Sequence, residues 1–223
     1  MLPALWCNRR PSPPYYPNIV TLDPTAGMAD VEPVLRILQA EPGMGAFGVK
    51  DSFARLGLSS HGFDRLFAAQ WIVRPADRVG VRLDDGVRWS CIESPAALAD
   101  WEAAWWRESQ PSGGAALQLF PPALLRSPGV SFVAGQRGGV IVAGCALTLS
   151  GEGADAVAGF SCAFVDRAAG IDREATLHAL LDAAHAQHPG RPLVGYDSGK
   201  DLALALRAGF QACGPLQVWL RRP

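Results

Sequence analysis

The chain has 223 residues with 49% apolar and 18% charged residues, a composition of one large or two small globular domains rather than of a disordered chain. Its formal net charge of −1 gives no electrostatic reason to expect a nucleic acid or an anionic membrane as a partner. No apolar run reaches the roughly 18 residues of a membrane span. The first residues lack the basic and apolar regions of a signal peptide. The five cysteines form no CxxC pair, so we expect reduced thiols in a cytoplasmic protein.

The first third of the chain predicts alternating strands and helices after a proline-rich lead-in. Pro11 to Pro17 (PSPPYYP) cannot enter a helix interior or a central strand, and we expect its two tyrosines to pack on the body. After Asp30, apolar residues recur at helical spacing, so this residue is predicted to cap a helix. The elements predicted here are strand 19–22, helix 30–38, strand 47–49, helix 51–56 and strand 66–73.

Charged and turn-forming residues from Arg74 to Gly86 mark the best candidate boundary. They divide the chain into predicted domains 1–80 and 87–223. Beyond this boundary, Ser94 followed by Pro95 is typical of a helix start. The predicted elements are strand 87–92, helix 95–108, a helical turn at 121–125, strands 130–136, 140–150 and 156–165, helix 172–187, strand 193–196, helix 199–208 and strand 217–220.

Two stretches of 16 residues indicate an internal repeat. Gly48 to Phe63 (GVKDSFARLGLSSHGF) and Gly195 to Phe210 (GYDSGKDLALALRAGF) both begin with glycine and end in Gly-Phe. When the two stretches are aligned, the same offset in residue number also aligns Arg74 with Arg221. We therefore interpret the two halves as related supersecondary units, the first of them truncated.

The order of elements from Val87 to Arg221 resembles the GNAT (N-acetyltransferase) superfamily. The segment RAAGID (Arg167 to Asp172) looks like the Q/R-x-x-G-x-G/A loop of that superfamily, and ALRAGF (Ala205 to Phe210) looks like its closing helix, which ends in Gly-Phe. The first part, from Ile19 to Arg74, resembles the C-terminal half of the same unit without its meander. The resemblance implies an α/β (α+β) fold: a mixed, mostly antiparallel sheet flanked by helices, preceded by a half-size repeat.

The resemblance also implies a site for acetyl-CoA or another acyl-CoA. Backbone amides at a helix N-terminus can donate hydrogen bonds to a pyrophosphate. Gly170 has no side chain, so the pyrophosphate can come close to these amides. The acyl carbonyl pairs, in the superfamily, with the backbone of a strand that here runs around Cys162 to Val165. The cofactor-binding residues so implied are Phe164, Val165, Arg167, Ala168, Ala169, Gly170, Ile171 and Asp172.

The sequence departs from the family pattern at two positions. Asp172 stands where glycine or alanine is usual, and its carboxylate repels a pyrophosphate unless the side chain turns away to cap the helix. Ala205 stands where many members carry a tyrosine that protonates the leaving thiolate. Tyr196 ends a strand that faces the acceptor cleft in the family, so it is the candidate catalytic acid in place of that tyrosine. Asp166 and Asp197 follow strands, and each either has a function or caps the turn.

Three further residues admit a chemical and a structural interpretation. His185 and His188 lie three residues apart on one predicted helix, but no acidic or cysteine partner is spaced to complete a metal site, so we expect a solvated last turn and no metal. Cys162 could be a nucleophile, yet no activating base is apparent, which favours a buried strand residue.

By resemblance, the predicted function is transfer of an acyl (acetyl) group from acyl-CoA to an amine of a small molecule or protein. The alternative is a catalytically silent GNAT-fold protein that serves as a binding or assembly module. A third option is binding of an unrelated small molecule. An exposed sheet edge on a half-size lobe also makes a homodimer possible.

Overall fold

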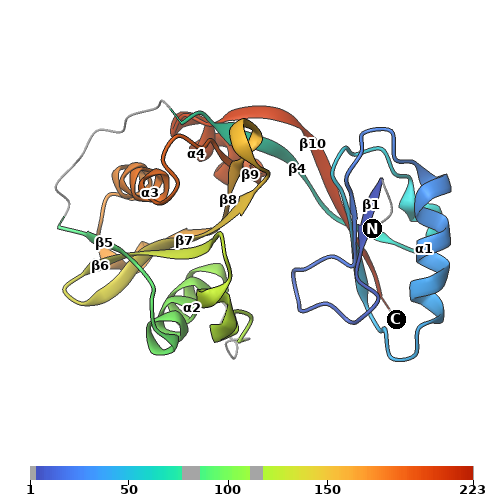
Figure 1. The fold of residues 1–223 in the computed structure, drawn as a ribbon, viewed down its shortest axis with the longest axis horizontal. Coiled ribbons are helices and arrows are strands. Elements are labelled where there is room, and N and C mark those ends of the chain that lie inside the picture. Colours follow the sequence, from blue (N-terminus) through green and yellow to red (C-terminus); the bar gives the residue numbers. More distant parts are fainter. Residues whose placement is uncertain (1–3, 77–85, 111–117, 223) are drawn as a thin grey trace. The chain divides into compact units, whose positions relative to one another are not determined.

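A computed structural model describes residues 4–76, 86–110 and 118–222 (Figure 1). The strands are β1 (Leu5–Cys7), β2 (Ile19–Thr21), β3 (Phe47–Asp51), β4 (Asp64–Arg74), β5 (Arg88–Cys91), β6 (Val130–Arg137), β7 (Val140–Ser150), β8 (Val157–Val165), β9 (Leu193–Asp197) and β10 (Gln211–Arg221). The α-helices are α1 (Met28–Ala40), α2 (Pro95–Ser109), α3 (Arg173–Gln187) and α4 (Gly199–Arg207). Short 3-10 helices span Leu58–His61, Pro122–Arg126, Gly153–Asp155 and Arg167–Ala169.

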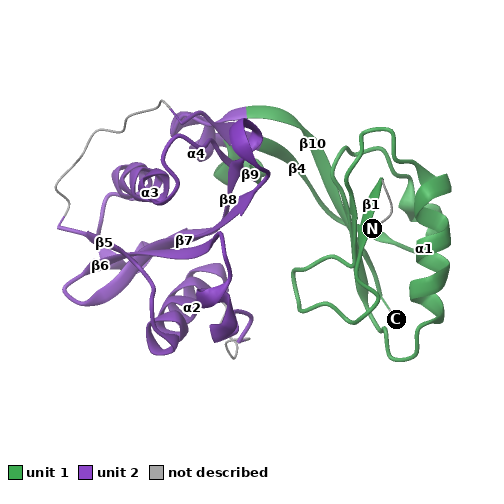
Figure 2. Ribbon diagram, viewed as in Figure 1, with its two compact units in different colours: residues 1–71, 196–202, 212–223 green, residues 72–195, 203–211 purple. Residues whose placement is uncertain are grey.

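The chain forms two compact units that each use separate stretches of sequence (Figure 2). Unit 1 comprises residues 1–71, 196–202 and 212–223, and unit 2 comprises residues 72–195 and 203–211. The last strand therefore belongs mainly to unit 1, whereas the predicted domains place it with residues 87–223. The predicted boundary segment between Arg74 and Gly86 lies largely outside the described residues.

Unit 1 is a sheet with one helix on one face. Its strands follow the order β1-β2-β3-β10-β4, with β2 parallel to β3 and β10 antiparallel to β3. Helix α1 lies along this sheet (Figure 1) and buries four apolar residues spaced along one side of the helix, as the sequence pattern predicts. The core beneath α1 includes Val31, Val34, Leu35 and Leu38 from the helix and Leu5, Ile19, Phe47, Val49 and Trp219 from the strands.

The start of α1 differs from the prediction. The helix begins at Met28 with Gly27 as its N-cap, so Asp30 is not the cap. The Asp30 carboxylate instead accepts a hydrogen bond from the amide of Gly27 at 2.9 Å, as the third residue of a capping box does. The lead-in tyrosines also differ from expectation, because Tyr15 is 64% exposed and Tyr16 is 49% exposed.

The helix predicted over residues 51–56 does not form. The Asp51 carboxylate accepts the amide of Leu56 at 2.7 Å and that of Phe53 at 3.4 Å, which closes a turn instead of a helix. The helical turn follows at Leu58–His61 and ends at Gly62, whose φ of 78° suits glycine.

Unit 2 is a meander with helices on both faces. Its strands follow the order β9-β8-β7-β6-β5, with antiparallel pairs from β5 to β8 and a parallel pair between β8 and β9. Helices α2 and α3 lie on opposite faces of this sheet (Figure 1). Trp101 of α2 is fully buried, and its indole donates to the carbonyl of Val133 at 2.9 Å. The predicted α+β fold with a mixed, mostly antiparallel sheet is thus confirmed.

A half-size repeat is not evident in the structure. Gly48–Phe63 holds a four-residue 3-10 turn where Gly195–Phe210 holds the nine-residue helix α4. The two stretches share their ends only: Gly62 and Gly209 both have positive φ, 78° and 95°, and each precedes a strand of 11 residues.

Candidate functional site

Strand β8 is bulged at the position where the acyl carbonyl is predicted to bind. Ser161 pairs with Ala146 and Phe164 pairs with Gly144 of β7, so two residues of β8 stand opposite the single residue Cys145. Cys162, in the bulge, has a φ of 51°. The ladder to β9 comprises two pairs at the start of β8, and the backbone of β8 beyond them is not paired with β9. Phe164 and Val165, two of the predicted residues, are therefore paired with β7 but not with β9.

The thiol of Cys162 has a structural role. Burial raises its pKa to about 11, although a hydrogen bond with Ser161 opposes that shift. The side chain packs against the apolar cluster that surrounds Trp101. A thiol with this pKa is protonated at neutral pH and is a poor nucleophile, which favours the buried strand residue over the nucleophile.

The loop after β8 has the backbone expected of an anion-binding turn. Arg167–Ala169 form a single 3-10 turn, and Gly170 follows with a φ of 62°. Asp172 then caps α3, since its Oδ1 accepts the amides of Glu174 at 2.9 Å and Ala175 at 3.0 Å. The carboxylate has therefore turned to the helix, and it occupies two amides that a bound anion would otherwise use.

The amides of this loop divide into two groups. The first three donate within the protein: Arg167 to Glu108 Oε2 at 3.3 Å, Ala168 to Asp166 Oδ1 at 2.8 Å and Ala169 to the Asp166 carbonyl at 3.3 Å. In the described part of the chain, no acceptor is found for the amides of the next three residues, which are Gly170, Ile171 and Asp172. Only these three of the predicted amides are open to a ligand.

Ion pairs tie the loop to the end of α2. Arg107 Nη2 lies 3.2 Å from Asp166 Oδ2, and Arg167 Nε lies 2.8 Å from Glu108 Oε1. Arg137 also donates to the carbonyl of Ala169 at 3.3 Å. Asp166 therefore caps and anchors this turn, and the carboxylates of Asp166 and Glu108 offset the charges of Arg107 and Arg167.

Tyr196 lies near the end of β9 and belongs to unit 1, whereas the loop belongs to unit 2. It is 39% exposed and stacks on Phe67 with a centroid distance of 6.3 Å. Trp71 meets it edge-on at 5.6 Å. The ammonium of Lys50 lies 4.2 Å from the centre of the tyrosine ring. The sequence did not point to Lys50, Phe67 or Trp71. Phe67 and Trp71 lie in the predicted strand 66–73 and Lys50 follows the predicted strand 47–49, and no local pattern links them.

Asp197, the next residue of β9, has a perturbed carboxyl group. Burial, helped by the negative charge of Asp201, raises the pKa of Asp197 to about 6. Because successive side chains of a strand point to opposite faces, Asp197 and Tyr196 serve different sides of the sheet. A carboxylate that titrates near pH 6 has the basicity of a general base.

Ala205 and His185 have structural contacts, and His188 is the C-cap of α3. Ala205 is buried in α4, and its carbonyl accepts the amide of Phe210 at 3.0 Å. His185 is partly exposed, and Arg74, itself only 2% exposed, contacts His185 Nδ1 at 2.8 Å. Over the described ranges, no group of three or more His, Cys, Asp and Glu residues could hold a metal ion, and no helix is long and apolar enough to cross a membrane.

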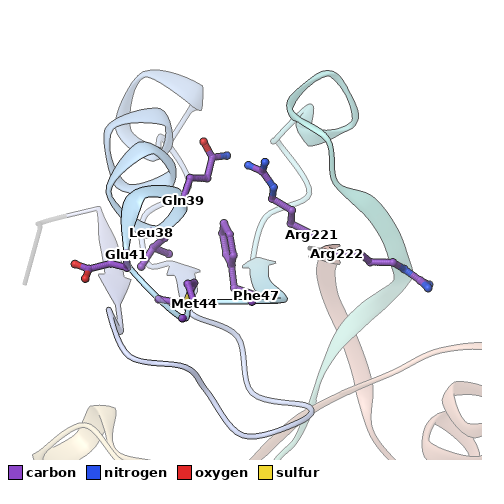
Figure 3. A pocket seen from close by; sticks show the side chains of 9 residues that line it. Leu38, Gln39, Glu41, Met44, Phe47, Arg221 and Arg222 are labelled. Carbon is purple, nitrogen blue, oxygen red and sulfur yellow. The ribbon is translucent and has the colours of Figure 1, made fainter.

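A pocket of about 250 Å³ lies in unit 1, at the end of α1 (Figure 3). Phe47 lies at its base, Gln39 and Arg221 face one another across it, and Arg222 points away. None of the predicted site residues lines this pocket.

Comparison with known proteins identifies the fold. No family model and no curated protein matches the sequence. A GCN5-related N-acetyltransferase from Kribbella flavida is similar with a TM-score of 0.62 at 15% identity, over 91% of this chain and 80% of that one. A conserved protein of unknown function from Staphylococcus epidermidis is similar with a TM-score of 0.63 at 12% identity, over 87% and 79%. A tandem GNAT protein from the clavulanic acid biosynthesis pathway has a TM-score of 0.53 at 14% identity, over 80% of this chain and 64% of that one.

These likenesses confirm the resemblance seen in the sequence at the level of fold. The chain has the fold of the GNAT N-acetyltransferases. At identities of 12–15%, the comparison extends to the fold alone.

Proposed function

We propose that the protein binds acetyl-CoA or another acyl-CoA and transfers the acyl group to an amine of a small molecule or protein. The observation that carries this proposal is the set of three open amides, Gly170, Ile171 and Asp172, at the start of α3. They follow strand β8, whose backbone beyond Gly159 is not paired with β9. This combination suits an anion at one end of a ligand and a carbonyl at the other.

In this proposal the pyrophosphate accepts hydrogen bonds from the three open amides, with Arg137 and Arg167 beside it. The backbone from Cys162 to Val165 orients the thioester carbonyl. The amine nitrogen then forms a bond to the acyl carbon, the carbon–sulfur bond breaks, and the electron pair leaves on the CoA thiolate. Positioning of the two reactants supplies most of the rate enhancement, because well-oriented reactions gain about 7 kcal/mol or more.

Two protons must move in this reaction. The amine loses one to water, and the thiolate gains one, which Tyr196 or water donates. Asp197 is left out of these steps, because its side chain and that of Tyr196 lie on different faces of the sheet.

Thermal unfolding with acetyl-CoA and CoA tests the binding step. A ligand at 100 times its dissociation constant stabilises the folded state by about 2.7 kcal/mol, so millimolar acetyl-CoA should raise the melting temperature measurably. Release of free thiol in the presence of an amine panel then tests transfer. The absence of any shift with millimolar acetyl-CoA and CoA would contradict the proposal.

The second candidate is a catalytically silent GNAT-fold protein that serves as a binding or assembly module. Two observations favour it: Asp172 already occupies two helix amides, and the buried Ala205 leaves no acid at the usual tyrosine position. Binding of acyl-CoA without thiol release for any amine would favour this candidate. A shift with other metabolites and none with CoA would instead favour binding of an unrelated small molecule.

We also propose self-association as a homodimer. Strands β1 and β5 are the outer strands of units 1 and 2 in the sheet order, and unpaired strand edges are sites where a second chain can add. Light scattering coupled to gel filtration measures the mass directly, and a monomer at all concentrations up to 100 times that of the assay would rule out the dimer.

A further inference from the structure

The face of the unit 1 sheet opposite α1 holds a lysine among aromatic rings. On β3, Phe47, Val49 and Asp51 are buried, and Phe47 and Val49 pack in the core beneath α1. Because strand side chains alternate, Lys50 points to the other face. Phe67 and Trp71 of β4 and Tyr196 of β9 meet there, as their ring contacts show. We call these four residues the aromatic lysine site, and all four belong to unit 1.

In the part of the chain that the structure describes, the ammonium of Lys50 contacts aromatic rings and no carboxylate. Its Nζ lies 4.3 Å from the centre of the Trp71 ring and 4.2 Å from that of Tyr196. Within the described ranges, no carboxylate forms an ion pair with it. The adjacent Asp51 lies on the other face, where it accepts the amides of Leu56 and Phe53.

This arrangement leaves a cationic group partly desolvated without a compensating charge. Burial lowers the pKa of Lys50 to about 8. Two cation–π contacts offset part of the lost hydration, but a ring supplies no hydrogen-bond acceptor for the three N–H groups of an ammonium. The donors of Lys50 are therefore available to an anion from outside the protein.

The aromatic walls of the site are held in place before any ligand arrives. The indole of Trp71 donates to the carbonyl of Ser52 at 2.8 Å, which fixes its ring. Trp71 and Tyr196 meet at an interplanar angle of 82°, and Tyr196 lies nearly parallel to Phe67 at 20°. A site with fixed walls loses little conformational entropy when a ligand binds.

We propose that the aromatic lysine site binds an organic carboxylate, whose oxygens accept hydrogen bonds from the Lys50 ammonium while its apolar body contacts the aromatic rings. One cation matches the single charge of a carboxylate. A phosphate dianion would bring a second, uncompensated charge against apolar rings, at a large desolvation cost. Tyr196 takes part in both proposals, but carboxylate binding is read from Lys50 and acyl transfer from thiol release, so either proposal can fail without the other.

Lysine side-chain NMR tests the proposal directly, because the chain has only two lysines, Lys50 and Lys200. Lys200 is exposed on α4 and serves as the internal control. In protein labelled with 13C at lysine Cε, titration with sodium benzoate should shift the Lys50 signal and raise the midpoint of its pH titration. The Lys200 signal should stay in place, and benzamide, the neutral analogue, should move neither signal.

Variants separate the charge from the fold. We expect Lys50→Met to weaken benzoate binding at least tenfold and Lys50→Arg to retain most of it, while Lys200→Met binds like the parent. The melting temperature of each variant shows that it is folded. The proposal is overturned if benzamide binds as tightly as benzoate, or if inorganic phosphate binds more tightly than benzoate. It is also overturned if Lys50→Met binds benzoate with unchanged affinity, or if benzoate shifts both lysine signals equally.

Discussion

Asp172 is the residue at which the fold and the proposed ligand conflict. Its carboxylate accepts the amides of Glu174 and Ala175, and therefore stabilises the start of α3. The same negative charge lies at the loop where a pyrophosphate is proposed to bind. The cap contribution and the charge can be separated by substitution, because asparagine caps a helix about as well as aspartate.

We expect Asp172→Asn to leave the free energy of unfolding within ~0.5 kcal/mol of the parent. Removal of one negative charge near the phosphates should tighten acetyl-CoA binding by roughly fivefold, since two charges about 4 Å apart in water interact by ~1 kcal/mol. Urea unfolding and isothermal titration measure the two quantities. Asp172→Ala is the control, because it removes the charge and also the cap, at a cost of ~1 kcal/mol. Unchanged affinity in Asp172→Asn would mean that no phosphate lies near this carboxylate.

Lys50 makes a second prediction at this scale, on stability and pH. Its pKa is about 8 in the folded chain against an ordinary value of 10.5, a difference that corresponds to roughly 3 kcal/mol against folding while the lysine is charged in both states. The Lys50→Met variant also loses the two cation–π contacts, which lowers its free energy of unfolding by about 0.5–2 kcal/mol. We therefore expect Lys50→Met to be more stable than the parent by ~1–2 kcal/mol at pH 7.

The sign of the pH dependence follows from these two pKa values. Below pH 8 the lysine is protonated in the folded and unfolded chains, and the cost is fully present. As the pH rises from 8 to 10.5, the folded chain loses the proton first, so the parent gains stability relative to Lys50→Met. Urea unfolding at pH 7 and pH 10 measures both proteins, with Lys200→Met as the control. An advantage of Lys50→Met that persists at pH 10 would contradict this account.

At the scale of elements, the local signals in the sequence predicted most of the helices and the meander. Ser94 does cap α2, accepting the amide of Ala97 at 3.2 Å, with Pro95 in the first turn. Strand β10 is longer than predicted, because Gln211 to Gly214 are polar or small and mostly exposed. Their strand conformation comes from pairing with other strands, which a local pattern does not contain.

The junction of β8 and β9 can be tested with a single methyl group. A Cβ on Gly195 would lie 2.8 Å from the carbonyl oxygen of Phe160, so alanine forces the two strands apart where their pairing ends. We expect Gly195→Ala to lower the free energy of unfolding by ~1–3 kcal/mol, as overpacking typically does. Gly57→Ala is the matched control, since its Cβ would meet nothing within 4 Å. Equal melting temperatures for both variants would show that β9 moves freely at this point.

At the scale of the whole molecule, sequence reasoning predicted the fold class correctly and pointed to the loop before α3, whose part in ligand binding stays a prediction. It did not bring together the residues of the aromatic lysine site. The loop is contiguous, so its motif is visible in the sequence. Lys50, Trp71 and Tyr196 meet only because β3, β4 and β9 come together in the fold, and no local period links them. The same reason hid the pairing of β10 with β3, whose residues lie far apart in the sequence.

That pairing makes the last prediction, which concerns what unit 1 needs in order to fold. Trp219 of β10 is 5% exposed within the unit 1 core and pairs with Val49 of β3. A fragment of residues 1–76 lacks this strand, and β10 is the neighbour of β3 in the sheet order. The fragment would leave the apolar side of β3 and α1 incompletely covered and the β3 edge unpaired.

We therefore expect residues 1–76 alone to show the circular dichroism of an unfolded chain without a cooperative thermal transition. The same fragment joined through a flexible Gly/Ser linker to residues 211–222 should regain the helical signal of α1 and unfold cooperatively. Trp219→Ala in the joined fragment is the control for packing, and it should cost ~3–5 kcal/mol, as for other buried tryptophans. If residues 1–76 fold cooperatively by themselves, the core of unit 1 does not depend on β10, and the boundary predicted near residue 80 describes an independent domain.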